Sequence, residues 1–210
     1  MAEGFGAYDI GNDSALLKLI GSANVACGFH AGDPMVMHRF VMQAKADGVS
    51  IGAHPGFPDL QGFGRRQMQM KPTEIEYITA YQIGALQAIA CYAGLKVTHI
   101  KGHGAMANMA MVDESYAMAM ARAAKTVDAS LIFMAHYGSH LQRAAEKTGL
   151  RVALEGYADR QYEDDGMLAS RAIPGTVIKD VKVAAAQALR MVQDGEIVSR
   201  HGKLLKVRID

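Results

Sequence analysis

The sequence has few cysteines, no tryptophan and no excess of charge of either sign. Its two cysteines, Cys27 and Cys91, lie far apart and form no CxxC pair. Two isolated thiols are typical of a reducing compartment, so we expect a cytoplasmic protein. There are 22 Lys and Arg residues and 21 Asp and Glu residues, for a net charge of +1. This balance argues against a nucleic-acid partner bound through a general basic surface.

Long apolar segments and polar low-complexity tracts are absent as well. The longest apolar stretch, ALQAIACYAGL, contains Gln87 and is much shorter than the roughly 20 residues that span a bilayer. The opening MAEGFGAYDIGND has acidic residues and glycines where a signal peptide has a basic start and an apolar segment. With five prolines and 50% hydrophobic residues, the chain is expected to form one globular domain over residues 1–210 with no membrane partner.

Short β-branched segments alternate with longer helical patterns. Asp33 and Pro34 predict the start of a helix that ends at Gly48, and the capping box beginning at Thr73 predicts the start of another. The alternation favours an α/β fold with a parallel sheet, either open or closed into a barrel. The predicted strands are 22–28, 49–53, 97–101, 130–135 and 151–155; further helices are expected near 113–127, 138–148 and 181–194, and a hairpin around 201–202.

Three histidines each follow a predicted strand directly. His30, His54 and His103 come after the first, second and third predicted strands. Because the loops at the carboxyl ends of parallel strands converge on one rim, we expect these histidines to share a site. Glu155 and Asp159 follow the fifth predicted strand and are expected at the same rim.

A lysine in the third predicted strand needs an anionic partner if it is buried. Alternation along a strand predicts that His99, Lys101 and His103 point the same way. The partner of Lys101 could be a phosphate, a substrate carboxylate, or Glu155 in a structural ion pair.

Two long segments, 55–71 and 156–171, are candidate covers for the site. Arg65 and Arg66 in the first of them are either anion ligands or solvated surface residues.

Several motifs of common enzymes are missing. No GxxxxGK[ST], GxGxxG or GxSxG sequence occurs, so neither a P-loop nor a serine nucleophile of that type is expected. The segment from Gly28 to Asp33 opens a helix and is only a weak indication of an anion site. Cys27 is expected to be a buried thiol and not a nucleophile.

Six stretches of the chain closely resemble the LamB/YcsF family, the family of 5-oxoprolinase A subunits. The resemblance covers nearly the whole chain and implies a seven-stranded βα (TIM-like) barrel, distantly similar to polysaccharide deacetylases. It also implies action with two partner subunits to open 5-oxoproline to glutamate using ATP, expected as its magnesium complex. The stretches are GFGAY (4–8), SANVACGFHAGDP (22–34), IGAHPGFPDLQGFGRR (51–66), YQIGALQ (81–87), THIKGHGAMAN (98–108) and ADRQYEDDGMLASR (158–171).

The chain departs from the family pattern at its ends and near Lys101. Family members usually begin with a strand containing Asp-x-Asn-x-Asp and finish in a further strand. We therefore expect a barrel without its first and last strands, in a chain truncated at both ends. Gly102, Met106 and Ala107 replace the usual Pro, Leu and Tyr.

The resemblance implies a role for each candidate residue in lactam hydrolysis. Lys101 with Arg65 or Arg66 would neutralise phosphate charge, and His54 or His103, with a pKa near neutrality, would move protons. Asp159 or Glu155 would orient an imidazole, and Arg160 or Arg171 would hold the substrate carboxylate. The full set is His30, His54, Lys101, His103, Glu155 and Asp159 for catalysis and Asn24, Arg65, Arg66, Asn108, Arg160 and Arg171 for substrate or phosphate binding.

Two other functions remain open from the sequence. The first is a metal-dependent amidohydrolase or deacetylase that works without ATP, in which His30, His54 and His103 bind a divalent cation together with Glu155 or Asp159. The second is a non-catalytic scaffold subunit that only docks its partners.

Overall fold

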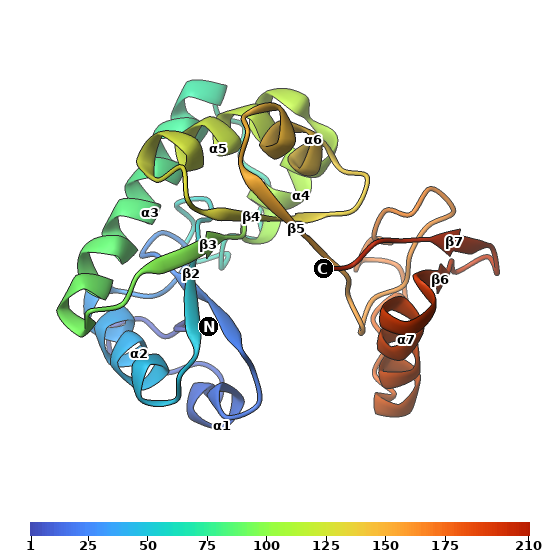
Figure 1. Ribbon diagram of the computed structural model, residues 1–210, viewed down its shortest axis with the longest axis horizontal. Coiled ribbons are helices and arrows are strands. Elements are labelled where there is room, and N and C mark those ends of the chain that lie inside the picture. Colours follow the sequence, from blue (N-terminus) through green and yellow to red (C-terminus); the bar gives the residue numbers. More distant parts are fainter.

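A five-stranded parallel sheet forms the centre of the protein in the computed structural model, which describes residues 1–210. The strands pair in chain order, β1-β2-β3-β4-β5, and β1 does not pair with β5. Helices surround the outside of this curved sheet (Figure 1). The predicted α/β fold is confirmed and is compatible with part of a TIM-like barrel, but the sheet is not a closed seven-stranded barrel. The strands are β1 Ser22–Ala26, β2 Ser50–His54, β3 Val97–Ile100, β4 Ile132–His136 and β5 Arg151–Glu155.

The helices begin where the chain supplies capping groups. The Asp33 carboxylate accepts hydrogen bonds from the backbone N–H groups of Met35 and Val36, which satisfies two donors at the start of α2. The helices are α1 Asp13–Leu17, α2 Pro34–Ala46, α3 Pro72–Ala93, α4 Gly104–Val112, α5 Glu114–Val127, α6 His140–Lys147 and α7 Val181–Asp194.

Two details of the helices differ from the sequence prediction. Helix α3 begins earlier than the Thr73 capping box predicts, because Pro72 takes the first helical position and Lys71 is the cap. The Glu74 carboxylate accepts the Lys71 backbone N–H at 2.7 Å. Helix α4 was not predicted, since its sequence, GAMANMAMV, is apolar almost throughout and has no periodic polar face.

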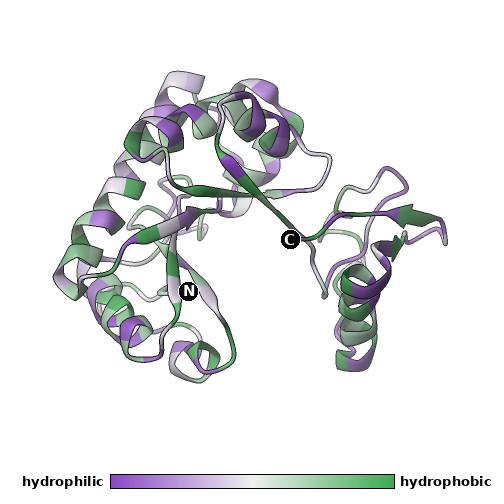
Figure 2. Ribbon diagram, viewed as in Figure 1, coloured by the Kyte–Doolittle hydropathy of each residue, from purple (hydrophilic) through white to green (hydrophobic).

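The main core lies between the sheet and the surrounding helices. One cluster of buried side chains includes Val25, Ile51 and Phe133 from the strands and Phe40 and Leu86 from the helices. Figure 2 shows mostly hydrophobic central strands and helices of mixed hydropathy. This pattern is the one expected of a sheet covered by amphipathic helices.

The C-terminal part has a small core of its own. Tyr162, Met191 and Ile197 form a separate buried cluster, and in Figure 1 helix α7 stands apart from the main sheet. The predicted hairpin is confirmed, because β6 Glu196–Val198 pairs antiparallel with β7 Leu204–Lys206. None of the helices combines the length and the hydrophobicity that a membrane span requires.

Candidate functional site

A cleft of about 690 Å³ opens at the carboxyl ends of the central strands. Parallel strands present their carboxyl ends at one edge of the sheet, so residues far apart in sequence meet there. Both long segments predicted as covers contribute to its walls. The predicted residues that line the cleft are His54, Arg65, Lys101, His103, Asn108, Glu155, Arg160 and Arg171.

The three rim histidines lie in direct contact. His54 ends β2 and His103 is the residue before α4; His54 Nε2 and His103 Nδ1 are 3.0 Å apart. The ring of His30 stacks on that of His103, with centroids 3.6 Å apart and planes 4° from parallel. The strand-end prediction therefore identified a real cluster, although His30 lies behind His103 and does not line the cleft.

Backbone carbonyl groups fix the tautomers of the two cleft histidines. His54 Nδ1 lies 2.7 Å from the carbonyl oxygen of Lys101, and His103 Nε2 lies 2.8 Å from that of Phe63. A carbonyl oxygen can only accept, so each of these nitrogens carries the ring proton and donates it. The two nitrogens that face each other, His54 Nε2 and His103 Nδ1, therefore carry lone pairs when the rings are neutral.

Burial keeps these rings neutral at physiological pH. It lowers the pKa of His30 to about 2, lowers the pKa of His54 well below its usual range, and lowers the pKa of His103. The neighbouring imidazole rings add to the effect at His30 and His54. The expectation of a pKa near neutrality is wrong for these residues, because their surroundings remove the water that would stabilise the charged form.

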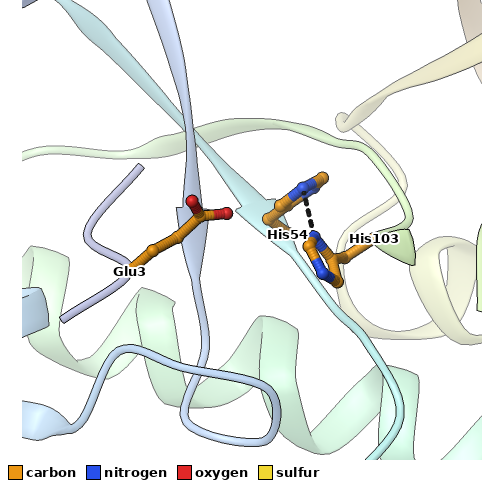
Figure 3. Close-up of side chains that lie close together, drawn as sticks. All are labelled: Glu3, His54 and His103. Carbon is orange, nitrogen blue, oxygen red and sulfur yellow. Dashed lines mark hydrogen bonds between the residues drawn. The ribbon is translucent and has the colours of Figure 1, made fainter. Parts of the chain in front are cut away.

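A carboxylate that the sequence analysis missed completes this cluster. Glu3 lines the cleft and lies close to His54 and His103, with one donor atom from each of the three residues within 4.8 Å of the others. Figure 3 shows the Glu3 carboxylate turned toward the two rings. The N-terminal segment is held there because the Gly32 N–H donates to the carbonyl of Gly4 at 2.9 Å. The only sequence signal was the position of Glu3 next to the GFGAY stretch.

The other side of the cleft contains a lysine that is already paired. Lys101 forms an ion pair with Glu155, and their side chains are 21% and 12% exposed. The hydroxyl of Tyr157 donates to Glu155 at 2.6 Å, and Lys101 Nζ lies 5.0 Å from the centroid of the Tyr157 ring. Burial raises the pKa of Tyr157, so it remains a hydrogen-bond donor. Lys101 and Glu155 were expected here from the sequence, whereas Tyr157, in the predicted cover segment, was not.

The expected alignment of three side chains along β3 is only partly present. Strand β3 ends at Ile100, so strand alternation does not extend to His103. His99 is buried, its Nδ1 lies 2.9 Å from the Thr98 hydroxyl, and its ring lies where a side chain on Gly52 would be. His99 is therefore part of the sheet packing.

The four arginines predicted to bind substrate or phosphate lie in different surroundings. Arg65 and Arg171 are exposed on the wall, while Arg160 is buried and donates to the carbonyl of Ala169 at 2.6 Å. Arg66 pairs with Asp59 beside a second, smaller pocket.

Asp159 is exposed and Asn24 lies within β1, and neither lines the cleft. No histidine is hydrogen-bonded to Asp159 or Glu155, so the structure does not bring the expected imidazole-orienting carboxylate into place. Cys27 is a buried thiol, as expected, and burial raises its pKa to about 12.

Comparison with known proteins decides the family. The model of the LamB/YcsF family matches residues 1–210. The chain belongs to the LamB/YcsF family. It is 54% identical to the 5-oxoprolinase A subunit of Rhodopseudomonas palustris (strain BisB5), over 100% of this chain and 83% of that protein. It is 55% identical to the 5-oxoprolinase A subunit numbered 2 of Bradyrhizobium diazoefficiens, over 100% of this chain and 82% of that protein.

A solved structure has the same backbone arrangement as this LamB/YcsF chain. The crystal structure of the lactam utilization protein from Thermus thermophilus superposes with a TM-score of 0.97 at 44% identity. The match covers 100% of this chain and 85% of that one.

Proposed function

We propose that this LamB/YcsF protein is a subunit of an ATP-dependent 5-oxoprolinase and takes part in hydrolysis of the lactam of 5-oxo-L-proline to L-glutamate. The relatives named as 5-oxoprolinase A subunits and the lactam utilization protein support the substrate class. The observation that carries the proposal is a cleft that combines bare histidine nitrogens with cationic side chains. The word subunit in those names supports a complex, which we propose contains two further subunits.

The histidine side of the cleft suits activation of water. His54 and His103 present neutral ring nitrogens with their protons committed to carbonyl groups. Their lowered pKa values make both rings weak bases, so a water molecule in the cleft would lose its proton to this pair only as its oxygen bonds to the lactam carbonyl carbon. The carbon–nitrogen bond of the ring breaks, and the departing nitrogen takes up a proton to become the amine of glutamate.

The cationic side of the cleft suits an anionic substrate. 5-Oxoproline carries one carboxylate, and Arg171 and Arg65 lie on the wall without an ion-pair partner. Arg160 is partly committed to Ala169, and Lys101 is committed to Glu155. We therefore assign carboxylate and phosphate binding first to the two free arginines.

The positive side chains of the cleft are compatible with the phosphates of ATP, although the chain has no dedicated phosphate-binding loop. A five-membered lactam is a poor electrophile whose closure competes with hydrolysis. In the reaction that we propose, the lactam oxygen takes the terminal phosphoryl group of ATP, expected with Mg²⁺, and ADP leaves. Water then attacks the activated carbon, and phosphate is released as the ring opens. The chain has no P-loop sequence, so its contribution is limited to the arginines and Lys101 of the wall.

Glutamate release from 5-oxoproline tests the proposal. Extract of a strain lacking only this gene is assayed with the purified chain added back, with and without ATP. We expect release to return only when both the chain and ATP are present. His54→Ala and His103→Ala should abolish the restored activity, whereas His201→Ala, at an exposed histidine of the hairpin, should retain it.

Other outcomes of this assay identify the alternative functions. Release without ATP would favour a metal-dependent amidohydrolase. Full activity of both His54→Ala and His103→Ala would contradict the assignment and favour a scaffold role.

A further inference from the structure

The two histidine nitrogens that face each other in the cleft have no proton to share. His54 Nε2 and His103 Nδ1 are 3.0 Å apart, within hydrogen-bond distance. The ring protons of both residues are directed to the carbonyl groups of Lys101 and Phe63 at 2.7 and 2.8 Å. Two lone pairs at this distance repel each other unless something positive lies beside both of them.

This arrangement is the one that metal-binding histidines adopt. A ligating imidazole presents one nitrogen to the cation and donates its other N–H to a carbonyl or carboxylate group, which fixes the tautomer and the ring direction. Both cleft histidines meet this condition through backbone carbonyls. The third group, the Glu3 carboxylate, is 27% exposed, and one of its oxygens lies within 4.8 Å of a ring nitrogen of His54 and of a ring nitrogen of His103.

From this geometry we propose that His54 Nε2, His103 Nδ1 and the Glu3 carboxylate form a binding site for one divalent first-row transition-metal cation, such as Zn²⁺ or Co²⁺. Two nitrogens 3.0 Å apart and each roughly 2.1 Å from a cation subtend an angle of about 90° at it. That angle suits adjacent positions of a five- or six-coordinate site. Two imidazoles and one carboxylate are a ligand set of first-row transition metals, and three protein ligands leave positions open to the cleft.

The geometry also decides which carboxylate and which histidines belong to the set. Glu155 is paired with Lys101 and hydrogen-bonded to Tyr157, so it is not available to the cation. An imidazole binds a cation in the plane of its ring. Since the ring of His30 is stacked parallel on that of His103 at 3.6 Å, a cation in the plane of His103 lies outside the plane of His30.

The site deepens the proposed function and can be tested without it. A cation at this position would take over the role of the histidine pair in activating water. Cation binding is measured in the absence of substrate, partners and ATP. Loss of the lactam activity and loss of the metal site are therefore separate results.

Calorimetric titration of the full chain with Zn²⁺, after removal of metal by a chelator, is the direct test. We expect one cation per chain with a dissociation constant in the micromolar range or below. Glu3→Gln and His54→Ala should weaken binding at least tenfold, and His201→Ala should bind as the wild type does. Co²⁺ added to the metal-free chain should give visible absorption bands that Glu3→Gln alters.

Folding is monitored by circular dichroism for every variant. If His54→Ala fails to fold, Glu3→Gln still tests the site, because Glu3 is partly exposed and its substitution should disturb the core little. Absence of stoichiometric uptake by the wild type would overturn the proposal. Wild-type affinity in a folded Glu3→Gln variant would overturn the ligand assignment.

Discussion

Removal of one member of the Lys101–Glu155 pair should destabilise the protein measurably. The two side chains are 21% and 12% exposed, so both charges are largely removed from water. Glu155→Gln leaves the Lys101 ammonium without an anion and changes the partner of the Tyr157 hydroxyl, which donates to Glu155 at 2.6 Å. Lys101→Met leaves the Glu155 carboxylate with Tyr157 as its remaining donor.

The expected loss follows from how far the pair is buried. Breaking a fully buried ion pair by removing one partner costs about 3–5 kcal/mol, because a buried charge is left uncompensated. Residual contact with solvent lowers this figure, and we expect Glu155→Gln to reduce the free energy of unfolding by about 2 kcal/mol. The double variant Lys101→Met/Glu155→Gln contains neither charge, so its loss should be smaller than the sum of the two single losses by about 1–2 kcal/mol.

Urea denaturation followed by far-ultraviolet circular dichroism measures these values, since the chain has no tryptophan for fluorescence. Arg122→Met and Glu76→Gln provide a matched control, because this ion pair is more exposed, at 44% and 26%, and should show weak coupling. Strict additivity of the Lys101 and Glu155 losses would refute the reasoning. Phosphate should also stabilise Glu155→Gln more than the wild type, because the variant frees Lys101 to bind an anion.

Three further predictions concern stability. Burial lowers the pKa of His99 from 6.5 to about 4, so the free energy of unfolding should be highest above pH 6.5 and should fall by up to about 3 kcal/mol as the pH drops toward 4. His99→Gln should flatten this part of the curve of stability against pH. An unchanged slope in the variant would contradict the assignment. Gly64→Ala should lower the melting temperature more than Gly166→Ala. Both glycines have positive φ, but a Cβ on Gly64 would lie 2.8 Å from the His103 ring, whereas a Cβ on Gly166 would have no atom within 4 Å. Equal losses would show that the histidine contact does not matter. Asp33→Ala should cost about 1–2 kcal/mol in urea denaturation because it removes the cap of α2, and Asp33→Asn should recover much of that loss.

The strands and the rim histidines could be predicted because their signals are local. Each of the five strands is a short segment with mostly apolar or small residues, and each is found within two residues of its predicted bounds. In a parallel sheet the residues after each strand meet at one edge, which brings His54 and His103 together. No long-range information was needed for that step.

The residues that were missed depend on contacts between distant segments. Glu3 reaches the histidines because the N-terminal segment is hydrogen-bonded to Gly32, and nothing in its local sequence indicates that pairing. Tyr157 belongs to a polar segment that gives no periodic signal. The lowered pKa of His54 depends on how many groups surround it in the fold, so the sequence suggested the ordinary value.

Lys101 contributes its side chain to one side of the cleft and its backbone carbonyl to the other. A substitution of its side chain therefore changes only the first side. The side chain of Lys101 pairs with Glu155, while its backbone carbonyl accepts the Nδ1 proton of His54 at 2.7 Å. A side-chain substitution such as Lys101→Met removes the positive charge and leaves that carbonyl in place. The tautomer of His54, and with it the lone pair directed at His103, should therefore survive the substitution. In Lys101→Met, affinity for an anionic substrate and affinity for Zn²⁺ should respond differently. The first should fall, because the Glu155 carboxylate in the cleft loses its cationic partner and repels the anion. The second should stay within about twofold of the wild-type value, since no metal ligand changes.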